Sequence, residues 1–192
     1  MSFWDQPRPI IADASPLNDG RLEEIEMVGP HLRVKGSIAL GMFNRLSDRV
    51  NHSRGYILVR EARLMRRNGD PTELTLEELM INQDEITFIG QRTAGSRGNG
   101  APEAYGRAVP REMRRFVFFT PGHTISAEVQ VLAESDLSSF AAATEPRFVP
   151  LLNARARSLA DRRVISHYEF LLLNRTQLTA VAEAARAASF AD

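Results

Sequence analysis

Apolar and polar residues alternate with a period of two through long stretches of the chain, which predicts half-buried β-strands. In the first stretch the apolar positions are Leu32, Val34, Ile38 and Leu40. Segments 22–28 and 32–40 are expected to form a hairpin across the turn at 29–30, because proline fixes φ and cannot join a strand ladder.

Two more hairpins are predicted from apolar runs that flank short polar turns. The first joins 79–81 to 86–89, and the second joins 168–173 to 178–181. The segment 73–79, which approaches the first of these hairpins, is compatible with a helical turn.

The apolar pattern recurs after a shift of 91 positions, which becomes 92 after one inserted residue near Ser53. Segment 25–28 then falls on 116–119, and segment 86–89 falls on 178–181. Few residues are identical, but the order of the segments and the strand phase are kept. We interpret the pattern as two related modules in tandem. The alternative is that two β-rich halves share ordinary alternation.

Each module is predicted to contain one short helix. Asn44 and Ser135 are expected to be the N-caps, since a polar side chain at that position accepts a hydrogen bond from a first-turn amide. Leu46 is expected to face the core one turn before Val50. The structural box of the first module comprises Asn44, Leu46, Ser47 and Asp48. Its counterpart in the second module comprises Ser135, Leu137 and Ser138.

The expected fold is mainly β (α+β), with two tandem homologous β-β-α-β-β-β modules packed with pseudo-two-fold symmetry and a short terminal helix. A module of roughly 70 residues would be marginally stable alone, so the modules are expected to bury apolar faces against each other. The expected boundaries are an extended arm at 1–20, module 1 at 21–91, a flexible linker at 92–112, module 2 at 113–183, and a C-terminal helix or tail at 184–192.

The first box and the strand after it resemble a family of small bacterial proteins of unknown function. The resemblance rests on an Arg-Leu-Ser-Asp run at 45–48, on Asn51, on the aromatic-led strand at 56–59 and on Ala62. It covers residues 34–89 and is weaker in the second module, which lacks the arginine and the aspartate of the run. The family has no established chemistry, so the resemblance implies a module identity and no active site.

Charge and composition exclude several classes of protein. Lys and Arg number 24 and Asp and Glu number 24, so no overall field favours nucleic acid or a membrane surface. The chain has no cysteine, which excludes disulfides and thiolate metal sites. No segment approaches the roughly 18 apolar residues of a membrane helix, and the first residues lack the pattern of a secretion signal. A soluble, cytoplasmic bacterial protein is therefore expected, associated with a membrane only through a partner complex.

No catalytic, metal or cofactor motif is found in the sequence. The four histidines, which are predicted to be surface or turn residues, lie in separate segments without ligand spacing: His31, His52, His123 and His167. We therefore expect no cofactor and no enzymatic activity, and an enzyme ranks third among the functional hypotheses.

The arm carries the main functional prediction. Its prolines prevent a helix or a central strand, yet large apolar anchors are spaced along it at Phe3, Trp4, Ile10 and Ile11. Tryptophan is enriched among interface hot spots because it buries a large area and keeps one donor. Arg114 and Arg115 form a dyad that suits either an acidic partner or the protection of a strand edge.

Together these features predict a non-enzymatic protein-binding or assembly module. It is expected to be an accessory or structural subunit that docks on a larger complex through its arm and linker; a membrane-bound photosynthetic complex is one example. The alternative hypothesis is a sensor or carrier that holds a small ligand between the two modules.

Overall fold

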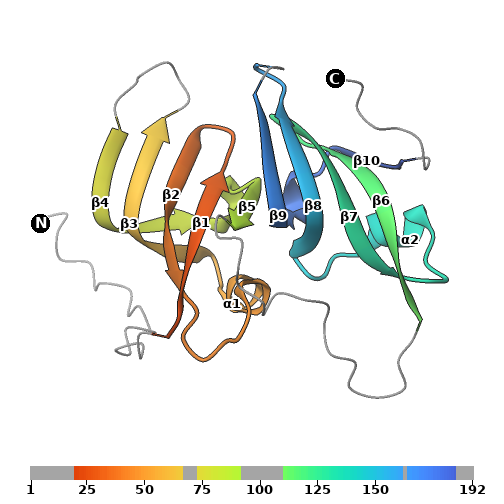
Figure 1. Cartoon of the computed structure of the whole chain (residues 1–192), viewed down its shortest axis with the longest axis horizontal. Helices are drawn as coiled ribbons and strands as arrows, with labels where there is room; N and C mark the ends of the chain where they lie inside the picture. Colours follow the sequence, from red (N-terminus) through yellow and green to blue (C-terminus); the bar gives the residue numbers. More distant parts are fainter. Residues whose placement is uncertain (1–19, 67–72, 92–109, 162–163, 185–192) are drawn as a thin grey trace, which may run out of the picture.

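The computed structural model describes residues 20–66, 73–91, 110–161 and 164–184. These residues form one antiparallel sheet of ten strands in the order β10-β6-β7-β8-β9-β5-β1-β2-β3-β4 (Figure 1). The prediction of a mainly β chain with little helix is confirmed. None of the helices in this described part is long and apolar enough to cross a membrane.

Residues 20–91, called here the N-terminal half, contain a meander of four strands and a fifth strand that returns to the first. The elements are β1 (Leu22–Val28), β2 (Leu32–Ala39), α1 (Leu46–His52), β3 (Tyr56–Arg66), β4 (Glu73–Asn82), the 3-10 turn η1 (Gln83–Glu85) and β5 (Phe88–Gln91). Successive strands from β1 to β4 are neighbours, whereas β5 pairs with β1 on the side away from β2.

Residues 110–184, the C-terminal half, follow the same order. The elements are β6 (Arg111–Phe119), β7 (His123–Leu132), α2 (Leu137–Ala142), β8 (Phe148–Ser158), β9 (Ile165–Asn174), the 3-10 turn η2 (Arg175–Gln177) and β10 (Ala180–Glu183). Strands β6 to β9 are successive neighbours, and β10 returns to β6. Strand β6 begins inside the predicted linker, while residues 92–109, 1–19 and 185–192 lie outside the described residues.

The predicted hairpins at 79–89 and 168–181 are wrong. The polar turns are present, but each is a 3-10 turn after which the chain leaves its previous strand. Strand β5 pairs with β1 and β9, and β10 pairs with β6. Alternation of side chains identifies a strand and its buried face, but it carries no information about the strand's partner. The helical turn considered for 73–79 is also wrong, because β4 is a strand from Glu73 onwards and pairs with β3 along that length.

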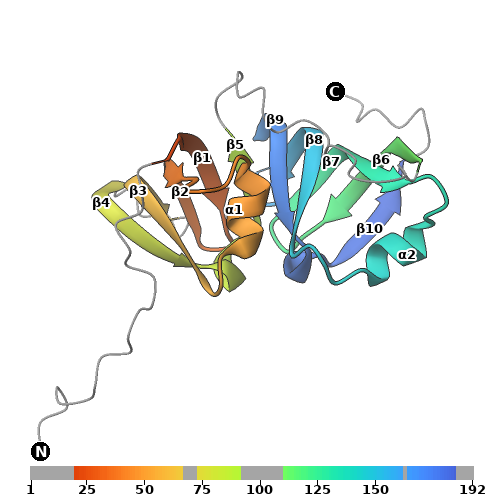
Figure 2. The same ribbon diagram turned by 90° about the horizontal axis from the view of Figure 1, so that it is seen from below.

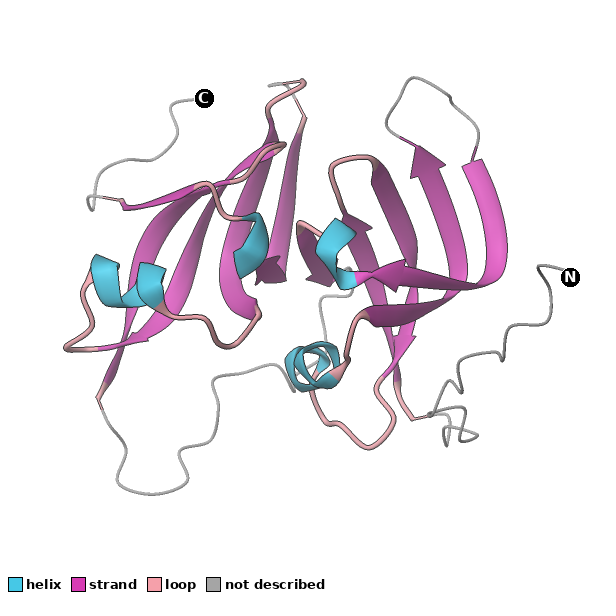
Figure 3. Cartoon of the chain, turned by 180° about the vertical axis from the view of Figure 1, so that it is seen from behind, coloured by secondary structure: helices cyan, strands magenta, loops and turns pink. Residues whose placement is uncertain are grey.

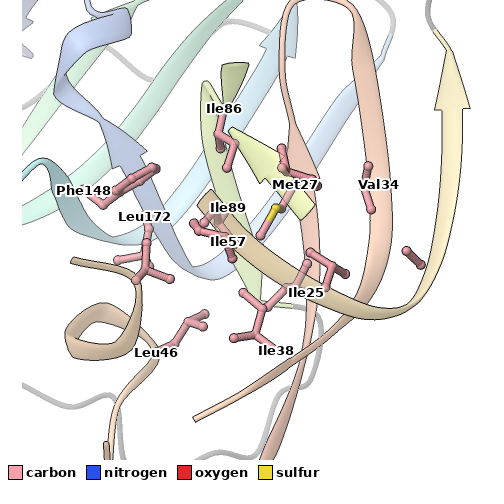
Figure 4. Close-up of a cluster of buried hydrophobic side chains, with 14 of the residues drawn as sticks. Ile25, Met27, Val34, Ile38, Leu46, Ile57, Ile86, Ile89, Phe148 and Leu172 are labelled. Atoms are coloured by element: carbon pink, nitrogen blue, oxygen red, sulfur yellow. The ribbon is translucent and has the colours of Figure 1, made fainter. Parts of the chain in front are cut away.

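The two halves share their hydrophobic cores across the middle of the sheet. The N-terminal core contains residues such as Ile25, Met27 and Ile57, and it is completed by Phe148, Phe170 and Leu172 of the C-terminal half (Figure 4). The C-terminal core in turn receives Val28 and Phe88 from the N-terminal half. Each fully buried side chain of this size contributes about 1.5–3 kcal/mol, so the exchange ties the two halves together.

The short helices lie at different places relative to the shared middle. Helix α1 lies beside the region where β5 meets β9, whereas α2 lies toward the far end of the C-terminal half (Figure 2). The view from behind shows the same separation of the two helices (Figure 3). The two helices are therefore covered by different neighbours, although they occupy the same place in the order of elements.

The predicted capping roles of Asn44 and Ser135 are wrong. Helix α1 has Arg45 at the N-cap position and no side-chain cap, and Asn44 is exposed one residue too early. In α2 the N-cap is Asp136, whose carboxylate accepts a hydrogen bond from the amide of Ser139 at 2.7 Å. An acid satisfies this orphan donor as well as a serine does, so adjacent polar residues compete for the position.

Candidate functional site

The region where the halves meet, called here the junction, is built on the antiparallel pairing of β5 with β9. Phe88 is opposite Leu173, and Ile89 is opposite Leu172. The buried Asn174 at the end of β9 donates through Nδ2 to the carbonyls of Gln83 (3.0 Å) and Ile86 (2.8 Å). Buried backbone carbonyls need such partners, so this asparagine fixes the relative position of the two halves.

Helix α1 adds a second polar link across the junction. The Asn51 side chain accepts a hydrogen bond from the amide of Phe148 at 2.8 Å and donates to the Phe148 carbonyl at 3.0 Å. It also donates to the carbonyl of Ser47 within the helix. The asparagine that ends the box therefore aligns the start of β8 with α1, a role that the resemblance did not indicate.

A charged cluster lies at the junction between β1, β2 and β9. The Glu26 carboxylate accepts hydrogen bonds from Arg33 Nε at 2.5 Å and from the Tyr168 hydroxyl at 2.8 Å. Burial opposes the charge on Glu26, but the bonds from Arg33 and Tyr168 outweigh it and hold the pKa of Glu26 below its usual range. Burial, with the negative charge of Glu26, raises the pKa of Tyr168. At neutral pH the cluster is therefore a carboxylate held by a guanidinium and a neutral phenol.

A small cavity of ≈ 240 Å³ lies next to this cluster. Val28, Arg33 and Phe88 line it from the N-terminal half, and side chains of the C-terminal half, including His123, Ser166 and Tyr168, line the remainder. The cavity thus combines an apolar wall with a few polar groups between the two halves. Typical pockets for small ligands measure about 300–1,000 Å³, so this one is small.

His123 is a further residue that sequence reasoning placed wrongly. It was predicted to be a surface or turn residue, but it is buried at the start of β7, and its ring meets that of Phe88 edge-on at 5.2 Å. The cluster of Glu26, Arg33 and Tyr168 was missed as well. Glu26 and Arg33 are 7 residues apart on the hairpin of β1 and β2, but Tyr168 is 142 residues from Glu26. The pairing of β5 with both β1 and β9 brings Tyr168 to the other two.

The two outer edges of the sheet form a second candidate site. Among the described strands, β4 has a neighbour on one side only, and it exposes Leu74 (41%), Leu76 (36%) and Met80 (52%). Tyr56, at the start of the adjacent β3, is 54% exposed. At the opposite edge, β10 pairs with a single strand of the described part of the chain, and all of its side chains are exposed or half-buried. A strand edge with apolar side chains is a template on which another chain can pair.

The predicted partner-binding residues are not brought together in the described part of the chain. Phe3, Trp4, Ile10 and Ile11 lie outside the described residues. Arg114 is half-buried and donates to the carbonyls of Ser135 (2.8 Å) and Ala133 (3.1 Å). Arg115 is exposed and pairs with Glu128 at 3.0 Å. The two arginines thus contact their own half of the protein.

The box residues differ in their surroundings. Leu46 is 0% exposed in the N-terminal core, whereas Leu137 is only partly buried against the C-terminal core. Ser47 donates to Asp48 at 3.4 Å, and Asp48 itself is exposed. Ser138 is exposed on α2. The box thus supplies one core side chain in each half, and its remaining polar members lie at or near the surface.

Within the described ranges, no group of three or more His, Asp or Glu side chains lies close enough to hold a metal ion. At the junction, the side chains of Asn51 and Asn174 and the cluster of Glu26, Arg33 and Tyr168 are hydrogen-bonded within the fold. Comparisons with models of protein families, with curated proteins and with solved structures found no match to the chain.

Proposed function

We propose that the protein is a non-enzymatic binding or assembly module that takes part in a larger assembly by pairing its open sheet edges with another chain. The observation that carries the proposal is the row of exposed apolar side chains on β4 and at the start of β3. Tyr56 and Met80 are more than half exposed although they lie on strands of an otherwise well-packed sheet. Large apolar side chains in such a position indicate a surface that is covered in the assembled state.

Docking through the arm and linker remains part of the proposal. The prolines and anchors at 1–20 suit a segment that docks on a partner, and a membrane-bound complex is the example of such a host. In this scheme the sheet edges supply strand pairing, and the arm supplies additional anchors. The protein is a cytoplasmic subunit that reaches a membrane only through its partners.

We also propose that the two halves are diverged copies of one module. Three local features that recur in both halves support this proposal. Each half has a register shift at the same place, between Lys35 and Ser37 in β2 and between Ser126 and Glu128 in β7. Glu61 and Asn153 both have φ of 50°. The asparagines Asn82 and Asn174 both cap the 3-10 turns that follow them. Such local features are not required by alternation, so their recurrence favours a common origin.

The edge proposal predicts that position 80 contacts another chain in the cell. A photo-crosslinking amino acid at Met80 is expected to give an adduct of higher mass in the native host, identified by peptide mass spectrometry. The same amino acid at Met42 is the control, because Met42 is 89% exposed and lies in a loop outside both edges. Equal labelling at the two positions, or none at Met80, would contradict the proposal.

The second candidate function is a small-ligand carrier or sensor, and the cavity at the junction favours it. A suitable ligand would pack its apolar body against Phe88 and place a hydrogen-bonding end at Arg33. If this reading is right, native mass spectrometry of the purified protein shows a retained small molecule. Arg33→Gln should then lose that molecule, while Arg63→Gln, a change at an exposed arginine outside the cavity, should keep it. If the wild-type protein and the Arg63→Gln variant both have the mass of the polypeptide alone, a tightly held ligand is ruled out.

A further inference from the structure

The junction inside the chain shows which two edges fit each other. Strand β9 is the fourth strand of the C-terminal half, and β5 is the fifth strand of the N-terminal half. Their pairing brings Phe148 and Leu172 into the N-terminal core, where both are 0% exposed (Figure 4). A fourth strand of one half therefore completes the open side of the other half.

The C-terminal half has the same open side, and nothing in the described chain covers it. Strand β10 takes the place that β5 has in the N-terminal half, because both follow a 3-10 turn and pair with the first strand of their half. Core positions near β5 are fully buried: Leu46, Ile86 and Ile89 are each 0% exposed. Their counterparts in the C-terminal half are only partly buried: Leu137, Leu178 and Val181.

The complementary surface is present at the other end of the sheet. Strand β4 takes the place of β9, and the positions that correspond to Phe148 and Leu172 are Tyr56 and Met80. These are the two side chains of that edge that are 54% and 52% exposed. One end of the molecule thus lacks a cover over its core, and the opposite end carries large apolar side chains at two of the three positions that form this cover at the junction. The third position, Phe170, corresponds to Glu78.

From this correspondence, and resting on the proposed function, we propose that the occupant of each edge is a second copy of this chain. Strand β4 of one molecule pairs antiparallel with β10 of the next, so that Tyr56 and Met80 pack over Leu137, Leu178 and Val181. The register of β5 with β9, carried over, places Met80 opposite Val181 and Leu79 opposite Ala182.

Side-chain sizes are compatible with this arrangement. At the junction, Gly90 lies against the ring of Tyr168, and a Cβ at position 90 would come within 2.3 Å of that ring. At the outer edges, Ala182 corresponds to Gly90 and Leu76 corresponds to Tyr168. The alanine is larger than the glycine that it replaces, and the leucine is smaller than the tyrosine. The acids Glu78 and Glu183 would approach each other, but each has an arginine at 3.8 Å, Arg60 and Arg114 respectively, which offsets their repulsion.

Such a contact joins two different surfaces, so it repeats from copy to copy. A heterologous contact of this kind generates a closed ring if the rotation between copies closes, and a filament if it does not. The ten-stranded sheet would then continue from molecule to molecule.

The absence of cysteine allows a direct test of the pairing. Met80→Cys and Val181→Cys are made in separate chains, mixed and oxidised. Residues directly opposite on antiparallel strands are close enough for a disulfide, so the mixture is expected to give a crosslinked pair and neither variant alone should do so. A crosslink formed by Met80→Cys with itself would overturn the proposal in favour of symmetric pairing of two β4 edges.

Light scattering and sedimentation of the full chain provide the second measurement. The purified wild-type protein is expected at a multiple of 21.5 kDa, and Met80→Arg is expected to return it to the monomer mass. Met42→Arg is the matched control and should leave the assembly unchanged. If the wild-type protein is monomeric at all concentrations and gives no mixed crosslink, the inference fails. Photo-crosslinks from position 80 to a different protein would still support the proposed function. Should Met80→Arg fail to fold, the cysteine mixture decides alone.

Discussion

Phe148→Ala is expected to lower the free energy of unfolding by about 3–5 kcal/mol and to loosen the N-terminal half, although position 148 belongs to the C-terminal half. The side chain is 0% exposed among residues such as Leu46 and Ile57, so its loss leaves a cavity in the N-terminal core. Denaturant unfolding measures the loss. Hydrogen exchange locates it, with the largest gain in exchange expected at β1, β5 and α1.

Phe119→Ala provides the control, since Phe119 is 40% exposed at the end of β6. Its truncation removes an equally large ring but opens no closed cavity, so the loss of stability should be much smaller. If Phe148→Ala increased exchange only in β8 and its neighbours in the C-terminal half, the two halves would not share the N-terminal core.

The two box leucines are expected to respond unequally to truncation. Leu46→Ala should cost about 2–5 kcal/mol through loss of apolar contact and cavity formation. Leu137→Ala should cost clearly less in the monomer, because Leu137 is only partly buried and water can occupy part of the space left. Thermal or denaturant unfolding of the two variants under identical conditions gives the difference.

Leu46 and Leu137 are each the first residue of their helix, so each variant serves as the control for the other. Leucine to alanine raises helix propensity slightly in both helices and cannot explain a difference between them. A loss of less than a few tenths of a kcal/mol for Leu46→Ala would mean that α1 is peripheral to the N-terminal core. Equal large losses would mean that the open side of the C-terminal half is covered even in the isolated molecule.

Most strands of the fold could be predicted from the sequence, because their side chains alternate between a solvent-exposed face and a buried face of the sheet. The hairpin at β1 and β2 was predicted correctly, since Gly29 and Pro30 allow a tight connection, and the Gly29 amide bonds to the Leu32 carbonyl at 2.9 Å. The destinations of β5 and β10 were not predicted. A 3-10 turn capped by asparagine has the composition of an ordinary hairpin turn. Only the tertiary structure shows that the strand after this turn does not pair with the strand before it.

The candidate site was less accessible to sequence reasoning than the fold. Glu26 follows the alternation of β1 as a polar residue that should face solvent, yet it is 5% exposed. Its burial depends on Tyr168, which lies in the other half. The sequence carried one usable signal for the edges. Leu74 and Leu76 lie in a run of β4 that is rich in glutamate, and large apolar residues in such a polar, exposed strand are unusual.

The sharing of cores has a consequence for synthesis of the protein on the ribosome. The first half emerges with its core lacking three side chains of the second half. Phe148 is the first residue of the third strand of that half, and Phe170 and Leu172 lie in its fourth strand. Until then, Leu46 and Ile89 remain at an open surface that other nascent chains or chaperones can reach. The order of translation therefore delays completion of the first core until most of the second half has been made.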